Sequence, residues 1–348
     1  MAGTIQLKTS KARWNRTDEE TNVAATATIV LLGGGSVRLK GVLGEDLSGT
    51  LAPVRKSDER ELDVSLKDGG MEGTFDDYSV VGARYIFGKK TYIDRVQAIA
   101  ADDNWKGNYV VVLKAESDES SLGNGYVGLS VQVKGGGKAR VTGTMPDGTR
   151  VAYNGRMEVL DELCLLPVVV PLHSGRKGGF GFLMGFAGDE VSVSSASSWR
   201  NTSVPFTSAL TEVGAGAVTK ITSDAVFSLE NAFESGDVEI DDSLLPEDVE
   251  VTVSGTRWVT PKSDRVKFIS DDATYDVLTE YGNPSGLSLS FKPVQGMFLG
   301  RFKVFAVTEA GKSKKYTATV SGAVLDGVGY GTATIKKIGS VPVTVTSE

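Results

Sequence analysis

The stretch from Asn283 to Val345 alternates apolar and polar residues with a period of two, and this pattern constrains the fold more than any other feature. Its first run places Leu287, Leu289 and Phe291 between serines and a lysine. A period of two puts one set of side chains on a buried face and the other in water, as a β-strand does. Turn signals rich in Gly, Asp and Pro separate the successive runs, with no room for crossover helices. The stretch therefore predicts a five-stranded antiparallel meander.

Looser versions of the same alternation fill the chain upstream, between Val23 and Leu43 and from Trp105 to Phe186. The 348 residues include 42 glycines without a collagen period, which indicates many tight turns. We therefore predict an all-β fold of two antiparallel β-barrel or β-sandwich domains built of meanders. One short amphipathic helix is expected at 89–101, because Tyr92, Val96 and Ile99 recur at helical spacing.

The best candidate boundary between domains is the Ser-rich segment 191–203, which we expect to be a linker or a long loop. It separates an N-terminal β-domain with one helix (1–190), divisible near residue 104, from a C-terminal meander domain (204–348). A weak internal repeat supports two related halves, since Gly128–Lys134 resembles Gly286–Lys292.

The charge and hydropathy of the chain exclude several classes of function. There are 37 basic and 44 acidic residues, a net charge of −7, which argues against a nucleic-acid partner or an anionic membrane surface. The longest apolar run, Leu163 to Leu172, is too short to span a bilayer and contains two prolines. No signal peptide is visible, so we expect a soluble chain without membrane insertion, and a mature region or fragment of a longer protein.

A single cysteine and a single histidine exclude an intrachain disulfide and a zinc site of the Cys/His type. Cys164 lies in the apolar run and is expected to be a buried, unreactive thiol. His173 would have to serve any Ser-His-Asp or Cys-His mechanism, but no nucleophile motif accompanies it. We therefore predict no catalytic residue, no cofactor and no metal site.

Two sets of residues offer alternatives to a purely structural protein. Trp14, Trp105, Trp199 and Trp258 could provide aromatic platforms for sugar rings, although tryptophans near the starts of strands are more often core anchors. The acidic pairs Asp76-Asp77, Asp241-Asp242 and Asp271-Asp272 could supply carboxylates for glycoside hydrolysis or calcium binding, but solvated turns are the default interpretation.

The chain resembles a known repeated module in four segments, 283–287, 296–304, 320–324 and 329–333. The segment 137–148 is similar to the strand and hairpin of the same module. The module is β-rich and occurs in very large, uncharacterised, putatively secreted surface proteins of Verrucomicrobia and Lentisphaerae. The resemblance covers about half the chain and rests on Gly and aromatic spacing. It implies an extracellular or cell-surface modular protein, and it carries over no catalytic residue.

Together these features predict a non-enzymatic structural or adhesive module of a large extracellular bacterial protein. Its expected partners are other modules of the same or a neighbouring surface protein. A carbohydrate-binding module is the alternative, with glycans as partners, and a glycoside hydrolase is less favoured.

Overall fold

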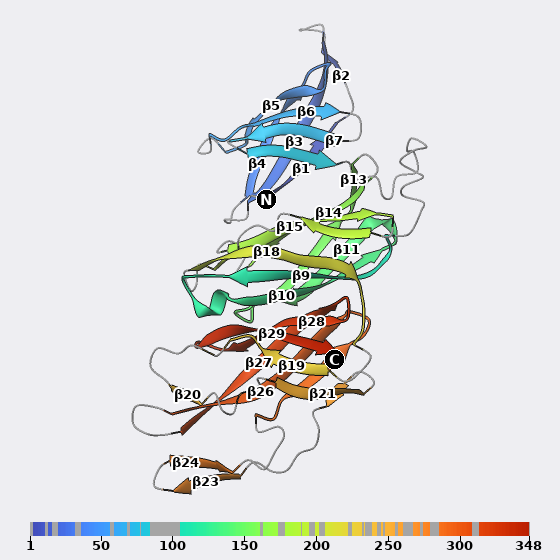
Figure 1. Cartoon of the computed structure of the whole chain (residues 1–348). Helices are drawn as coiled ribbons and strands as arrows, with labels where there is room; N and C mark the ends of the chain where they lie inside the picture. Colours follow the sequence, from blue (N-terminus) through green and yellow to red (C-terminus); the bar gives the residue numbers. More distant parts are fainter. Residues whose placement is uncertain are drawn as a thin grey trace.

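The computed structural model of the chain contains almost only β-strands, and most of them form three large curled antiparallel sheets that follow one another along the molecule (Figure 1). The structure describes residues 3–10, 13–15, 20–31, 36–55, 59–67, 70–76, 78–83, 105–160, 163–172, 178–188, 190–194, 199–201, 206–221, 225–231, 233, 239–241, 245, 248–254, 257–259, 267–271, 274–278, 285–307 and 313–347. The predicted all-β, antiparallel fold class is confirmed. The helix expected at 89–101 lies outside the described residues.

The first sheet, here the N-terminal half-barrel, has the strand order β1-β3-β4-β5-β6-β7-β8, with β2 beside β3. The strands are β1 (Gly3–Thr9), β2 (Arg13–Asn15), β3 (Glu20–Leu31), β4 (Ser36–Leu43), β5 (Ser48–Pro53), β6 (Leu62–Lys67), β7 (Gly70–Phe75) and β8 (Tyr78–Ala83). Alternate residues of all the main strands form one core on the inner face, including Leu39, Leu51 and Leu62, which are fully buried.

The second sheet, here the middle half-barrel, follows the order β12-β11-β10-β9-β18-β17-β15-β14-β13, with β16 beside β15. Its strands are β9 (Gly107–Glu116), β10 (Gly125–Lys134), β11 (Lys138–Thr144), β12 (Arg150–Arg156), β13 (Glu158–Leu160), β14 (Leu163–Pro171), β15 (Gly178–Ala187), β16 (Glu190–Ser194), β17 (Trp199–Asn201) and β18 (Phe206–Ala217). Two 3₁₀ turns, η1 (Ser121–Gly123) and η2 (Gly135–Gly137), flank β10. The Tyr153 hydroxyl of β12 donates to the Pro167 carbonyl of β14, 3.1 Å away, and draws the two ends of the sheet together.

The third sheet closes on itself, because β26 pairs with β25 on one edge and with β27 on the other. We call it the C-terminal barrel. Its strands are β19 (Ala225–Leu229), β20 (Glu239–Asp241), β21 (Asp248–Ser254), β22 (Arg257–Val259), β25 (Ser288–Lys292), β26 (Met297–Val307), β27 (Ser313–Leu325), β28 (Val328–Ile335) and β29 (Gly339–Ser347). The hairpin of β23 (Lys267–Asp271) and β24 (Thr274–Leu278) forms a separate two-stranded sheet. The predicted five-stranded meander is confirmed as β25 to β29.

The strand order places the change from the second sheet to the third between Ala217 and Ala225, later in the chain than the Ser-rich segment. That segment contains most of β16 and all of β17, which pair with β15. The high serine content of this segment predicted an exposed connection, but the Val193 side chain points into the middle core and is 7% exposed. Two alternating valines were enough to make a strand, because only one face of an outer strand needs to be apolar.

Candidate functional site

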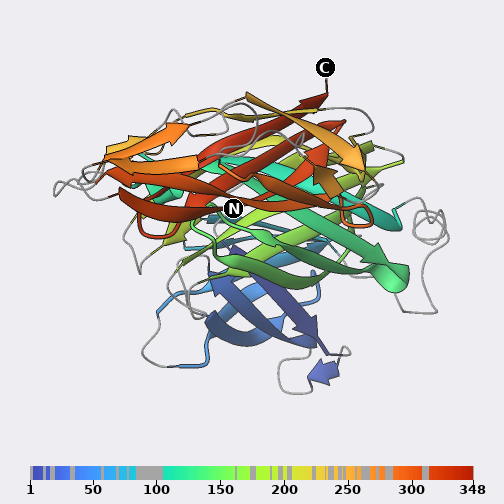
Figure 2. The same ribbon diagram turned by 90° about the horizontal axis from the view of Figure 1, so that it is seen from below.

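The middle half-barrel and the C-terminal barrel lie side by side (Figures 1 and 2), and the contact between them is the most extensively built site outside the three cores. We call it the barrel interface. Strand β9 buries both of its faces there. Val111 and Leu113 point into the middle core, whereas Val110 and Val112 point outward into a second apolar cluster. All four are fully buried, and such two-sided burial requires a partner surface on the outer face of the sheet.

The C-terminal barrel supplies that partner surface from β26 and β27. Met297, Ala323 and Leu325 complete the apolar cluster around the two outward valines of β9. Ala323 and Leu325 alternate along β27 with Val324, which belongs to the core of the barrel itself. Each contacting strand therefore packs the side chains of one face into its own core and those of the other face into the barrel interface.

Glycines bring the two backbones close together. A Cβ atom added at Gly128 of β10 would lie 2.5 Å from the main-chain nitrogen of Ala323 and 2.7 Å from the carbonyl carbon of Gly322. A Cβ at Gly125 would collide with the side chain of Thr332. Because backbone cannot move aside as a flexible side chain can, Gly128 is a position where only hydrogen fits.

Hydroxyl groups of β28 bond directly to the main chain of the middle half-barrel. Thr332 Oγ1 donates to the Tyr126 carbonyl at 2.8 Å, and Thr334 Oγ1 donates to the Pro146 carbonyl at 2.5 Å. Both threonines are buried, with 2% and 7% of their surface exposed. A buried hydroxyl without a partner would cost about 1–3 kcal/mol, so these bonds fix the position of one barrel against the other.

The turn η1 forms a second polar contact with the C-terminal barrel. Ser340 Oγ of β29 is 2.9 Å from the Ser121 carbonyl and 2.7 Å from the Asn124 carbonyl. In the opposite direction, Ser121 Oγ donates to the Ile338 carbonyl at 3.1 Å. Donors and acceptors therefore come from both sides, which favours one orientation of the two barrels.

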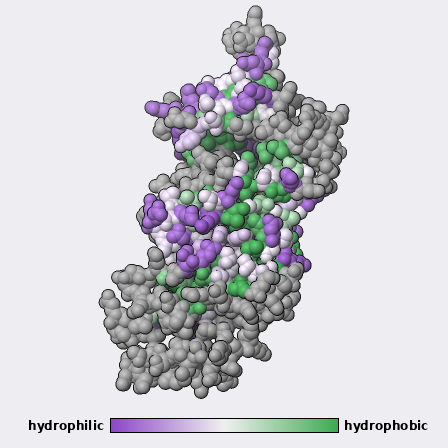
Figure 3. All heavy atoms as spheres, viewed as in Figure 1, coloured by the Kyte–Doolittle hydropathy of each residue, from purple (hydrophilic) through white to green (hydrophobic). Residues whose placement is uncertain are grey.

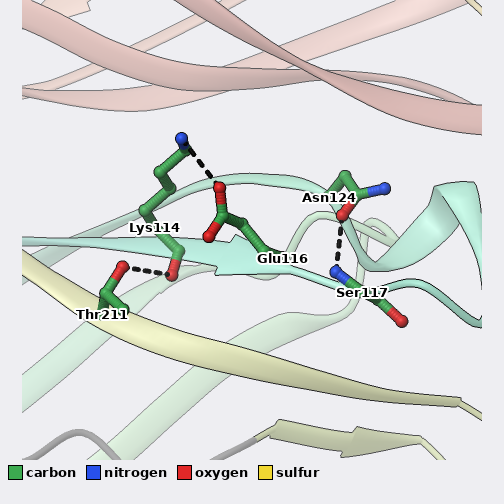
Figure 4. A network of polar contacts seen from close by, with 5 residues as sticks. All are labelled: Lys114, Glu116, Ser117, Asn124 and Thr211. Atoms are coloured by element: carbon green, nitrogen blue, oxygen red, sulfur yellow. Dashed lines mark hydrogen bonds and ion pairs between the residues drawn. The ribbon is translucent and has the colours of Figure 1, made fainter.

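A polar network borders the barrel interface, and Figure 4 shows the part of it around the end of β9. There the Lys114 ammonium pairs with the Glu116 carboxylate at 2.9 Å, and Asn124 Oδ1 accepts a hydrogen bond from the Ser117 amide at 2.7 Å. Bonding to the Glu116 carboxylate raises the pKa of Lys114. An exposed ion pair of this kind contributes little stability on its own.

Tyr126 and Tyr330 meet edge to face in this border, with ring centroids 5.2 Å apart. Burial raises the pKa of the Tyr126 phenol well above its ordinary value, and the Glu230 carboxylate that accepts its hydrogen bond acts in the same direction. Both causes favour the neutral phenol. Tyr126 therefore packs against Tyr330 of the C-terminal barrel with its phenol in the neutral form.

Of the four tryptophans predicted as sugar platforms, the structure describes the side chains of two, Trp105 and Trp199. Trp199 of β17 is fully buried in the middle core, where it packs edge to face on Phe206 with centroids 4.9 Å apart. Trp105 is 5% exposed and belongs to the same core. These two rings are core anchors, the alternative that the sequence offered to sugar platforms. A ring that stacks on a sugar must be exposed, and these two are buried. Trp14 lies in β2 and Trp258 in β22, and their side chains lie outside the described part, so that prediction remains untested for both.

The other candidate groups give no reactive centre in the described residues. Cys164 is buried, as predicted, and burial raises its pKa to about 11, which disfavours the reactive thiolate. Asp76 is exposed in a turn at φ 50°. Within the described ranges, no three His, Cys, Asp or Glu side chains are placed to hold a metal ion. His173 and the second residue of each acidic pair lie outside the described residues.

Comparison with known proteins identifies no relative that carries an argument about function. No family model and no curated protein matches the sequence. The chain is similar, at 8% identity, to a chain in the crystal structure of S. cerevisiae core factor; the alignment covers 100% of this chain and 62% of that chain, with a TM-score of 0.09. We also find, in the part of the chain that the structure describes, no helix with the length and apolar character that crossing a bilayer requires.

Sequence reasoning missed the barrel interface, although a signal for it was present. The run Tyr109 to Leu113 contains no polar residue and so does not alternate. An antiparallel strand without alternation is apolar on both faces, which indicates a second contact surface. The contribution of Thr332 and Thr334 had no such signal, because a polar outward residue usually contacts water.

Proposed function

We propose that this chain is a structural module of a large extracellular bacterial protein, and that its task is to hold neighbouring β-domains in a fixed, extension-resistant arrangement. The barrel interface is the observation that carries the proposal. It combines an apolar cluster, close backbone contact at Gly128 and direct side-chain to main-chain hydrogen bonds. Domains joined only by a flexible linker would not need such contacts.

Three further features support a structural role. The C-terminal barrel is a closed ring, which removes most of the free strand edges that promote aggregation. The two tryptophans whose side chains are described stabilise a core and face away from solvent. The Gly and aromatic spacing of the C-terminal meander resembles a repeated module of putatively secreted surface proteins. These points also support the expected partners, which are other modules of a surface protein.

A pulling experiment on the whole chain, held at its two ends, tests the proposal. If the middle half-barrel and the C-terminal barrel form one mechanical unit, they unfold in a single event whose contour length corresponds to both. The Gly128→Leu variant should split that event into two smaller ones, because the added side chain cannot fit against Ala323. The matched control is Gly135→Ala, where an added Cβ would meet only Lys106 Cε at 3.8 Å, so the single event should persist.

Two results would contradict the proposal. One is independent unfolding of the two barrels in the unmodified chain, with no effect of Gly128→Leu. The other is saturable binding of the folded chain to a polysaccharide or mucin-type glycan in a broad panel, which would move the function to carbohydrate binding.

A further inference from the structure

The hairpin of β14 and β15 is apolar on both faces, like β9, but its outer face lies on another side of the middle half-barrel. Its inner residues Cys164, Leu166 and Val168 face Phe186, Met184 and Phe182 in the middle core. The outer positions are Leu163, Leu165, Pro167 and Val169 on β14, opposite Gly185, Leu183 and Gly181 on β15. We call these seven residues the outer apolar face. It contains no charged or hydrogen-bonding side chain.

Burial along this face is uneven, which shows that something already lies against part of it. Val169 is only 4% exposed, although it belongs to none of the hydrophobic cores. Leu163 at the other end of β14 is 44% exposed, and Leu165 and Leu183 are half-buried. In Figure 3 hydrophobic residues gather on the surface of the middle half-barrel just below the N-terminal half-barrel. An apolar outer face of this kind usually contacts another protein surface.

The inner face of the N-terminal half-barrel is not completely covered by its own strands. Among the described strands its sheet is open, since the strand order ends at β1 on one side and at β8 on the other. Ile5 and Leu7 of β1 point toward its core but are only half-buried, whereas Leu39 in the centre of the sheet is fully buried. A curled sheet of this size buries its inner face completely only if another element covers the open side.

The two edges of that open side lie against neighbouring strands of the middle half-barrel, β14 and β13. Strand β1 contacts β14, and β8 contacts β13. Figure 1 likewise shows the N-terminal half-barrel directly beyond β13 and β14. We propose that the outer apolar face is the docking surface of this chain's own N-terminal half-barrel, which closes its open side on β14 and β15.

This arrangement makes the N-terminal half-barrel dependent on the middle half-barrel for part of its core. The dependence goes beyond the proposed function, because it concerns a different interface from the one between the two barrels. It also assigns a role to the apolar run around Pro167, whose outer side chains the middle core does not use.

Hydrogen exchange on the full chain, read peptide by peptide, tests the docking. Leu165→Asp and Leu183→Asp place a charge on the outer apolar face without touching the middle core. We expect amides of β1 and β8 to exchange about tenfold faster or more, since opening of this contact becomes easier. Amides of the C-terminal barrel should keep their rates. The matched control is Leu299→Asp, an outward residue of β26 that is 37% exposed, which should leave β1 and β8 unchanged.

Two further measurements keep the proposal falsifiable. The Cys164 thiol should stay unreactive in both variants, which shows that the middle core remains folded; if it becomes reactive, the milder Leu165→Ser replaces Leu165→Asp. Unchanged exchange of β1 and β8 in a variant with an unreactive Cys164 would overturn the proposal. So would a concentration-dependent dimer of the unmodified chain that Leu165→Asp dissociates without changing that exchange, since the occupant would then be a second copy.

Discussion

The hydroxyl of Thr332 in β28 donates a hydrogen bond of 2.8 Å to the carbonyl of Tyr126 in β10, and it does so across the boundary between two sheets that each have a complete core. The neighbouring Gly125 leaves the space into which the threonine side chain fits. A hydrogen bond between a side chain and a main-chain carbonyl depends on both distance and direction, so this contact sets the relative position of the two barrels more strictly than apolar burial alone.

Replacement of Thr332 by valine should weaken the barrel interface by about 1–2 kcal/mol, because valine has the same shape but cannot donate. The change is measured as faster exchange of the β28 and β10 amides and a lower urea midpoint for the transition that includes them. Thr319→Val is the control, since Thr319 is exposed and its hydroxyl bond to the Thr334 carbonyl is 3.4 Å long. Equal effects of the two changes would contradict a special role for Thr332.

Replacement of Gly128 by alanine should cost about 1–3 kcal/mol, because the methyl group would overlap the backbone of Ala323 and Gly322. The loss should appear as separation of the unfolding transitions of the middle half-barrel and the C-terminal barrel in calorimetry. Gly135→Ala serves as the control, and a Gly128→Ala chain with the unmodified melting profile would show that the two backbones are not held together at this point.

Alkaline pH should weaken the barrel interface through Tyr126. Because burial and Glu230 raise its pKa above the ordinary 10.0, the folded chain keeps the phenol proton to a higher pH than the unfolded chain does. The corresponding stability is fully present below pH 10.0 and is lost as the pH rises toward the folded-state pKa. Burial also raises the pKa values of Tyr109 and Tyr153 in the middle core, so the whole chain should lose stability in the same direction.

The contribution of Tyr126 is isolated by Tyr126→Phe, which cannot ionise. Urea midpoints at neutral pH and above pH 10 should fall less with pH in this variant than in the unmodified chain. Tyr316→Phe is a suitable control on a partly buried tyrosine away from the interface. A pH dependence identical in the Tyr126 variant and the unmodified chain would show that this phenol does not titrate with opening of the interface.

The Cys164 thiol should react with a disulfide reagent only after the middle half-barrel opens. Its pKa of about 11 keeps the thiol protonated at neutral pH, and its buried position keeps reagents away from the sulfur. At pH 8 we expect modification of the native chain to follow its opening rate, and complete, rapid modification in strong denaturant. Rapid stoichiometric labelling of the native chain would contradict a buried thiol.

Replacement of Trp199 by alanine should destabilise the middle half-barrel by about 3–5 kcal/mol, because it empties a fully buried site. Its indole Nε1 finds no acceptor among the described residues, so Trp199→Phe, which removes that donor and keeps a ring against Phe206, should be much milder. Circular dichroism and thermal unfolding distinguish the two variants. A Trp199→Ala chain that melts normally would place the indole outside the core.

Local patterns were enough to predict the all-β class and the strands of the C-terminal meander. The alternation of Leu287, Leu289 and Phe291 predicted an inner face that is indeed buried, and the single Cys164 was correctly assigned to a core. These features depend on neighbours within a few residues, through the pleat of a strand and the turns that reverse it. The Ser-rich segment was misleading because outer strands need only a few inward side chains.

The sequence by itself determined the fold class and the C-terminal meander, because period-two patterning depends on neighbours a few residues apart. The residue counts also excluded an intrachain disulfide and a zinc site of the Cys/His type. Only the tertiary structure decided which outward faces meet. Thr332 and Gly128 are ordinary surface residues of a strand until another sheet is placed against them, and no spacing along the chain states that Gly128 will lie against Ala323. Contacts between outer faces depend on how three curled sheets stack, and that is a property of the whole chain.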